Sequence, residues 1–193
     1  MARTESDILI PELEEYARQV EAIKRDATDL VVELSEAQFN WRPEAGRWSI
    51  AECLTHLNVT ARQYFPLIRA AIEQARARHL LSAGPFRHGF LGNWFVRSLE
   101  PPVKRRFKAP KIFVPPPDQP FVSVVPEFMG VQEQLLRFVR DANGVDLARA
   151  KVHSPASRLI RISLGQSLAL LAAHERRHLW QARQVKDDPR FPL

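Results

Sequence analysis

Apolar residues recur at three- and four-residue intervals in four long stretches of the chain, with polar residues between them. This spacing is typical of amphipathic α-helices, which bury one face and expose the other. It predicts helices over about Ile8–Leu34, from Ser49 to beyond Ile72, from about Pro126 to Asn143, and from Ser163 to about Val185. With no credible strands between them, these segments favour an all-α fold, a four-helix bundle.

Two helix starts are marked by sequence. Ser49 and Glu52 have the spacing of a capping box, in which the hydroxyl and the carboxylate each accept a backbone N–H, and Ser163 and Gln166 repeat it. Pro66 lies inside the second predicted helix and cannot donate to the preceding turn, so we expect a kink there.

A long insertion, from about Leu80 to Val125, holds most of the prolines and forms the crossover between the second and third helices. The prolines exclude long regular elements. We expect one short helix within Gly89–Leu99, and extended loop at Lys111–Val114 and Phe121–Val125. All 193 residues are expected to form one domain with this basic, proline-rich elaboration.

The composition is that of a globular protein, with 45% hydrophobic and 26% charged residues. The single cysteine, Cys53, excludes an internal disulfide and a thiolate metal cluster, and it is expected in the core. The longest apolar run, Leu168–Ala173, is too short to span a bilayer, and acidic residues interrupt the N-terminal stretch. A cytoplasmic protein without a membrane span is therefore expected.

Three histidines fall on apolar helix faces. His174 and His178 are one turn apart, close enough to bind a single ion together, and His56 lies on the face defined by Cys53 and Leu57. A buried imidazole needs partners for both nitrogens, and a metal ion is one way to supply them. Spacing alone leaves open a metal site or hydrogen-bonded core histidines.

The string from His174 to His178 also matches the His-Glu-x-x-His motif of zinc proteases, with Glu175 as the general base. Glutamines stand at positions 181 and 184, where one class of these enzymes has glycine and histidine, and no sheet is predicted before the helix. The sequence therefore argues against a protease. We expect Glu175 to form a salt bridge with a basic neighbour.

Two segments resemble the signatures of the DinB/YfiT-like superfamily. Phe39–Leu57 contains a Trp-x-Pro stretch, a Trp-Ser-Ile helix start at Trp48, and His56 within the helix. His174–Gln181 contains two histidines four residues apart and a glutamine three residues further on. The insertion is not recognisable from this resemblance.

The resemblance implies a four-helix bundle in which His56, His174 and His178 hold one divalent ion, nickel or zinc. It implies a thiol-dependent transferase or a hydrolase acting on a small molecule, with a low-molecular-weight thiol as a candidate cofactor, and a homodimer. Three imidazoles leave a coordination position open, where a bound water or thiol becomes more acidic. The catalytic group itself is not identified.

Other side chains are candidates for lesser roles. Gln181 lies one turn beyond His178 and Tyr64 two turns beyond His56, so both are candidates for contact with a ligand or the substrate. Trp41 and Trp48 are expected to wedge the preceding loop against the core. Loop or surface positions are expected for the remaining histidines, which are His79, His88 and His153.

The stretch Arg76–Lys111 carries nine basic residues and one acid, Glu100, interleaved with aromatic residues. Such a stretch can pack as a solvated loop, contact nucleic acid or anionic lipid, or attract an acidic substrate. No recognised nucleic-acid-binding module is present. Three classes remain open: a metal-dependent enzyme, a bundle that binds metal or ligand without turnover, and an interaction protein using the basic insertion.

Overall fold

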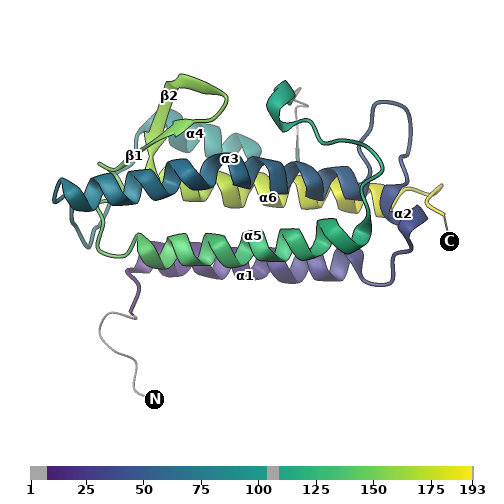
Figure 1. Cartoon of the computed structure of the whole chain (residues 1–193), viewed down its shortest axis with the longest axis horizontal. Coiled ribbons are helices and arrows are strands. Elements are labelled where there is room, and N and C mark those ends of the chain that lie inside the picture. Colours follow the sequence, from purple (N-terminus) through teal and green to yellow (C-terminus); the bar gives the residue numbers. More distant parts are fainter. Residues whose placement is uncertain (1–7, 104–108, 193) are drawn as a thin grey trace, which may run out of the picture.

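The computed structural model describes residues 8–103 and 109–192, apart from the side chain of residue 158, and it is mostly helical. Four long helices lie side by side in two layers (Figure 1). Helices α3 and α6 form one layer, α1 and α5 form the other, and each pair packs on the other. The bounds of the long helices are Pro11–Val31 for α1, Ile50–Ala77 for α3, Phe121–Asp141 for α5 and Leu164–Lys186 for α6.

Shorter elements complete the described chain. They are α2 (Glu36–Asn40), α4 (Phe90–Leu99), the 3-10 turn η2 (Lys111–Phe113) and an antiparallel hairpin of β1 (Lys151–Ser154) and β2 (Ser157–Ser163). The short helix expected within Gly89–Leu99 is α4. The hairpin corrects the all-α expectation.

Apolar faces of the four long helices meet in a continuous interior with two clusters. One surrounds Phe39, Leu54 and Phe128, and the other surrounds Leu13, Ile68 and Phe138; all six are almost fully buried. Cys53 is also fully buried, as expected. No helix in the described ranges is both long and apolar enough to cross a membrane.

Capping determines where α3 and α6 begin. The Ser49 hydroxyl accepts the Glu52 N–H, and the Glu52 carboxylate accepts the Ser49 N–H at 2.9 Å, which confirms the predicted box. Arg42 donates two hydrogen bonds to the same carboxylate, which keeps it paired although it is buried. Ser163 and Gln166 form the matching box at the start of α6. The helix α3 continues through Pro66.

Two expectations for the insertion were wrong. Phe121–Val125 is the first part of α5, and Lys111–Phe113 is a 3-10 turn rather than extended chain. The backbone N–H of Phe121 donates to the Glu36 carboxylate of α2, so a side chain remote in sequence caps the helix start. Pro126 is then inside the helix, where its missing N–H leaves one carbonyl, that of the exposed Val122, to solvent.

Polar contacts from α1 and α6 hold the segment between α3 and α5 against the long helices. His88 Nε2 lies 2.8 Å from the Glu12 carboxylate, and its Nδ1 lies 2.8 Å from the Ser163 hydroxyl. Gln166 donates to the carbonyl of Gly89 at 2.7 Å, just before α4. His88 therefore lies on a loop, as expected, but it is a largely buried contact point rather than a free surface residue.

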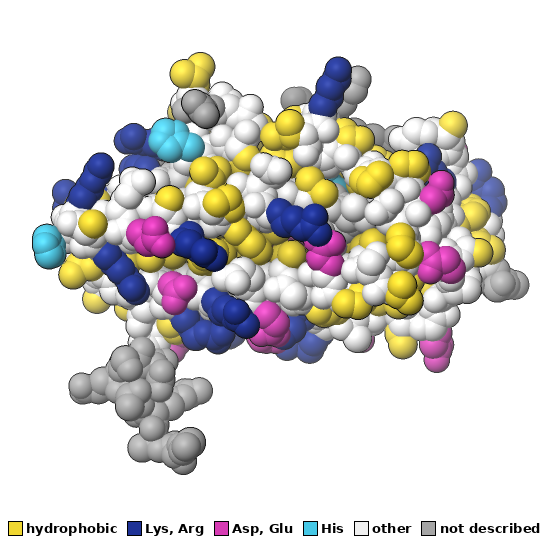
Figure 2. Space-filling model, in the orientation of Figure 1, with side chains coloured by type: hydrophobic (Ala, Val, Ile, Leu, Met, Phe, Trp, Pro, Cys, Tyr) yellow, Lys and Arg dark blue, Asp and Glu magenta, His cyan; other side chains and the backbone are white. Residues whose placement is uncertain are grey.

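Charged side chains of both signs alternate across the face formed by α3, α5 and α1 (Figure 2). Two ion pairs on this side, Lys24 with Glu133 and Arg62 with Glu127, link α5 to its neighbours. Part of the predicted basic stretch, Lys104, Arg105, Arg106 and Lys108 together with Phe107, lies outside the described residues.

Candidate metal centre

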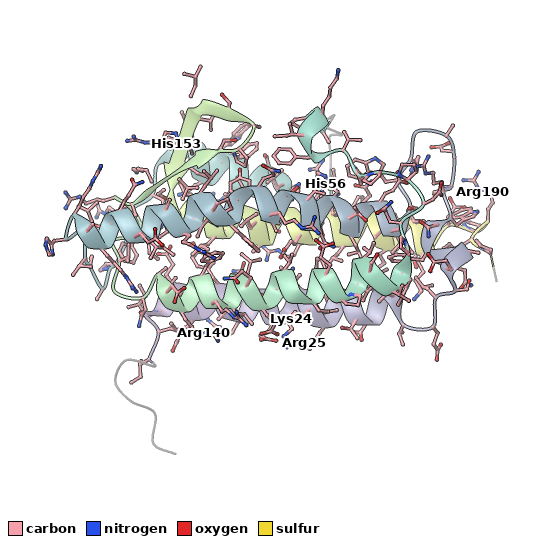
Figure 3. All side chains as sticks on the ribbon, in the orientation of Figure 1. Lys24, Arg25, His56, Arg140, His153 and Arg190 are labelled. Atoms are coloured by element: carbon pink, nitrogen blue, oxygen red, sulfur yellow. The ribbon has the colours of Figure 1, made fainter. Side chains whose placement is uncertain are left out.

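Three histidines from two helices converge between α3 and α6. One ring nitrogen from each of His56, His174 and His178 lies within 4.8 Å of the other two. The ring centroids are 4.5 to 5.0 Å apart. Figure 3 shows His56 in the middle of the molecule, beneath the segment that carries η2. The group could hold one metal ion.

Helix geometry explains this convergence. His174 and His178 project from successive turns of α6 on the side that packs against α3, and His56 projects back from α3. His56 and His178 are 3% and 7% exposed, while His174 is partly buried. The site is therefore part of the helix interface rather than a surface cluster.

Two of the three rings have one nitrogen fixed by an oxygen acceptor. His56 Nδ1 lies 2.6 Å from the backbone carbonyl of Phe113 in η2, and His178 Nδ1 lies 3.0 Å from Gln181 Oε1. Carbonyl oxygens can only accept, so both Nδ1 atoms carry the hydrogen. The lone pairs are thereby left on Nε2, which is the usual arrangement around a histidine ligand.

His174 supplies the test of whether an ion fits. Its Nε2 lies 3.2 Å from His56 Nε2. Two imidazole nitrogens bound at about 2.0–2.1 Å to a tetrahedral zinc ion lie about 3.3 Å apart, so this separation suits a shared ion. The buried His174 Nδ1 has no hydrogen-bond partner among the described residues. The donor set and its spacing therefore fit a divalent cation.

Burial keeps the three imidazoles neutral. It lowers the pKa of His174 to about 3, with further lowering by His56 and Arg177, and it lowers the pKa values of His56 and His178 as well. A metal ligand must be deprotonated, and near neutral pH no proton has to be displaced from these rings.

Aromatic groups enclose the cluster on two sides. The Trp48 ring lies 4.8 Å from the His56 ring and stacks 5.6 Å from the His178 ring, while the Phe113 ring meets His56 edge-on at 6.4 Å. Sequence reasoning assigned Trp48 only to packing and did not single out Phe113. Trp48 stands just before the helix that carries His56, and this position in the sequence could have indicated that it lies at the histidine cluster. Phe113 holds His56 through its backbone carbonyl, a contact that no residue type in the sequence indicates.

Gln181 and Tyr64 differ in their placement. Gln181 contacts His178 directly, as described above, whereas Tyr64 is buried in the cluster around Ile68 and its hydroxyl interacts with Ser154 of β1. The structure therefore brings Gln181 to the histidines and directs Tyr64 to the hairpin. His79 and His153 are exposed and distant from the cluster, on the loop after α3 and on β1.

Glu175 faces α5 instead of the histidines. Gln132 donates to its carboxylate at 2.9 Å, and both side chains are buried. Burial raises the pKa of Glu175 to about 7. The salt bridge expected for Glu175 is absent among the described residues, because its neighbour Arg176 pairs with Glu100 of the insertion. Its position does not suit the general base of a zinc protease.

Comparison with known proteins gives one assignment. No curated protein and no solved structure matches the chain significantly. A family model described as DinB superfamily matches residues 19–182, a range that contains all three histidines of the cluster. Since the match covers most of its length, the chain belongs to the DinB superfamily.

Proposed function

We propose that this protein is a metal-dependent enzyme that acts on a small molecule through an ion held by His56, His174 and His178. The observation that carries the proposal is the convergence of three neutral imidazoles whose nitrogens lie within 4.8 Å of one another. We further propose that α1, α3, α5 and α6 form the four-helix bundle of the family, with the insertion as a crossover.

Zinc or nickel is the ion we propose. Imidazole suits both metals, and three protein ligands leave a position for substrate, which distinguishes catalytic from structural sites. When bound, such an ion acts as a Lewis acid that lowers the pKa of a coordinated water or thiol. The chain itself orients the ligands, since Phe113 and Gln181 fix two of the three rings.

Two reactions fit this site. In a transfer reaction, the sulfur of a low-molecular-weight thiol forms a bond to an electrophilic carbon, the leaving group departs with its electron pair, and the thiol proton is released. In a hydrolysis, water is added across an ester or amide bond to give an acid and an alcohol or amine. Trp48 and Phe113 would shield the reacting groups from bulk water in either case.

A metal-binding bundle without turnover is the second candidate. The near-complete burial of His56 and His178 favours it, because a substrate needs access to the open coordination position. The two candidates share the ligand set and differ only in catalysis, so they can be separated by measuring metal content and turnover on the same preparations.

The first experiment is elemental analysis of untagged protein and of the His56→Ala and His174→Ala variants. We expect about one zinc or nickel ion per chain in the parent and loss of the ion in both variants. His79→Asn is the matched control, because His79 is exposed, has a positive φ of 53° that asparagine tolerates, and lies outside the cluster. Circular dichroism checks that each variant is folded.

Turnover is then measured on the metal-loaded parent with low-molecular-weight thiols and electrophiles, and with ester and amide substrates. Activity that disappears in His56→Ala and remains in His79→Asn supports the enzyme. Stoichiometric metal with no turnover in either screen supports the non-catalytic bundle. A folded parent that takes up neither zinc nor nickel contradicts both candidates.

A further inference from the structure

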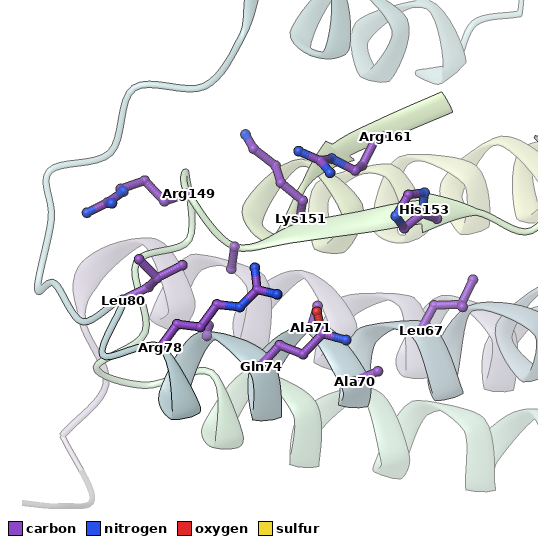
Figure 4. Close-up of a pocket in the computed structure, with 12 residues that line it drawn as sticks. Leu67, Ala70, Ala71, Gln74, Arg78, Leu80, Arg149, Lys151, His153 and Arg161 are labelled. Carbon is purple, nitrogen blue, oxygen red and sulfur yellow. The ribbon is translucent and has the colours of Figure 1, made fainter. Parts of the chain in front are cut away.

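A cavity of about 260 Å³ lies between the second half of α3 and the β-hairpin. Figure 4 shows Arg78, Gln74 and Leu67 along α3 on one side and Lys151, His153 and Arg161 on the hairpin opposite. A water molecule occupies about 30 Å³ of liquid, so the cavity has room for about nine waters, or for one small organic molecule.

The polar lining is strongly basic. Alanines and leucines of α3 and the loop that follows it supply the apolar part of the wall. No aspartate or glutamate is among the residues that line the cavity in the described part of the chain. The basic lining residues are Arg78, Arg149, Lys151, His153 and Arg161.

The register of the hairpin gathers these charges on one face. Lys151 and His153 are two residues apart on β1 and share a face, while Val152 between them is buried toward the core. Arg161 of β2 pairs directly with His153 and is diagonal to Lys151. The two permanent cations of the hairpin, Lys151 and Arg161, therefore lie diagonally across it on the same face, where an anion could contact both.

The arginines and the lysine of this lining form no ion pair with a described residue. None of Arg78, Arg149 and Arg161 forms an ion pair with a described residue, and Lys151 donates only to the backbone carbonyl of Ala148. Arginines without an ion pair also lie elsewhere in the described chain, such as Arg25 and Arg140, but here four unpaired cations line one space that has no carboxylate among its described lining residues. The lining therefore offers guanidinium and ammonium donors to a ligand from outside the chain.

We propose that this basic cavity binds a compact dianion that carries a small organic group, namely a phosphate monoester or a dicarboxylate. Arginine forks bind both oxyanions through paired hydrogen bonds, and the apolar wall accommodates the organic part. The site is separate from the histidines. Leu67 and Arg78 follow His56 by 11 and 22 residues in α3, which places them about 16 and 33 Å further along the helix.

The shape favours a small anion over nucleic acid. A nucleic-acid backbone needs an extended groove that tracks successive phosphates, usually with aromatic side chains for base stacking. Among the described residues that line the cavity, none other than His153 is aromatic, and they surround a single, partly open space. An oligonucleotide is therefore the competing ligand in the test.

The test is isothermal titration calorimetry on the full chain at low ionic strength, with inorganic phosphate, succinate and a short single-stranded oligonucleotide as separate ligands. The cavity variant is Arg78→Gln/Arg161→Gln, and Lys151→Gln is a second, single variant. The control is Arg25→Gln/Arg140→Gln, which removes the same charge from α1 and α5 on the far side of the molecule from His153 (Figure 3).

We expect phosphate or succinate to saturate one site per chain. Loss of two charge-assisted donors should weaken binding at least about tenfold in the cavity variant, with a smaller loss in Lys151→Gln and less than about twofold in the control. Which dianion binds more tightly identifies the ligand class. Equal weakening in the cavity and control variants, or saturation by the oligonucleotide alone, would overturn the proposal.

Discussion

The contact between Gln181 and His178 makes a quantitative prediction about metal affinity. With an ion on Nε2, the Nδ1 of His178 must carry its hydrogen, and this buried N–H then depends on Gln181 Oε1 at 3.0 Å. Without an ion, the Gln181 amide can turn its NH2 group toward Nδ1, so the ring can then also take the other tautomer. Gln181→Leu should therefore destabilise the metal-loaded protein more than the metal-free protein, by about 1–3 kcal/mol for an unsatisfied buried donor. This corresponds to a loss of about 5- to 150-fold in metal affinity.

Competition against a chromogenic chelator in metal-buffered solution measures this loss. Gln184→Leu is the matched control, since Gln184 is exposed on the same helix and makes no contact with the histidines. Gln181→Glu keeps the acceptor and adds charge, so its affinity should equal or exceed that of the parent. An affinity of Gln181→Leu within about twofold of the parent, in folded protein, would refute the proposed role of this amide.

Three further substitutions test the packing around the site. His88→Ala should lower the free energy of unfolding, measured in urea, by about 2–3 kcal/mol through the lost bond to Glu12. A double-mutant cycle with Glu12→Ala should show a coupling energy above about 0.5 kcal/mol, and additive effects would contradict the contact between His88 and Glu12. Gln132→Leu should lower the free energy of unfolding by about 1–3 kcal/mol, because it leaves the buried Glu175 carboxylate unpaired. An unchanged urea midpoint would contradict a stabilising role for the bond between Gln132 and Glu175. Gly165→Ala places a Cβ 2.5 Å from the His88 ring and 2.8 Å from Glu12 Oε1, so it should destabilise the parent. In the His88→Ala background the clash with the ring is removed and the loss of thermal stability should be smaller; an equal loss in both backgrounds would contradict the clash with His88.

The long helices and the histidines of the cluster were predictable because their signals are local. Period-3.6 apolar patterning and two capping boxes define α3 and α6, and the four-residue spacing of His174 and His178 needs nothing beyond helix geometry. The apolar face of the second helix singled out His56 as well, and the family resemblance, which the family model confirms, implied that all three histidines hold one ion. These features depend on residues within a turn or two of one another.

The features that sequence reasoning missed depend on contacts between remote segments. The start of α5 at Phe121 depends on Glu36, and the orientation of His56 depends on a carbonyl 57 residues away. The hairpin was missed because β1 is only four residues long, and a basic strand facing a cavity has no apolar alternation strong enough to predict it. His88 is an isolated histidine in the sequence, and only the fold shows its two partners.

The order of the ligands along the chain has a consequence for biosynthesis. His56 is translated 118 residues before His174, which at about 5–20 residues per second is an interval of about 6–24 s. During that interval the nascent chain contains only one of the three histidines of the cluster, His56, and cannot hold an ion through all three. The three-histidine cluster can form only after α6 has been made and has docked on α3, so the proposed ion would be acquired by the assembled helices and not by the growing chain.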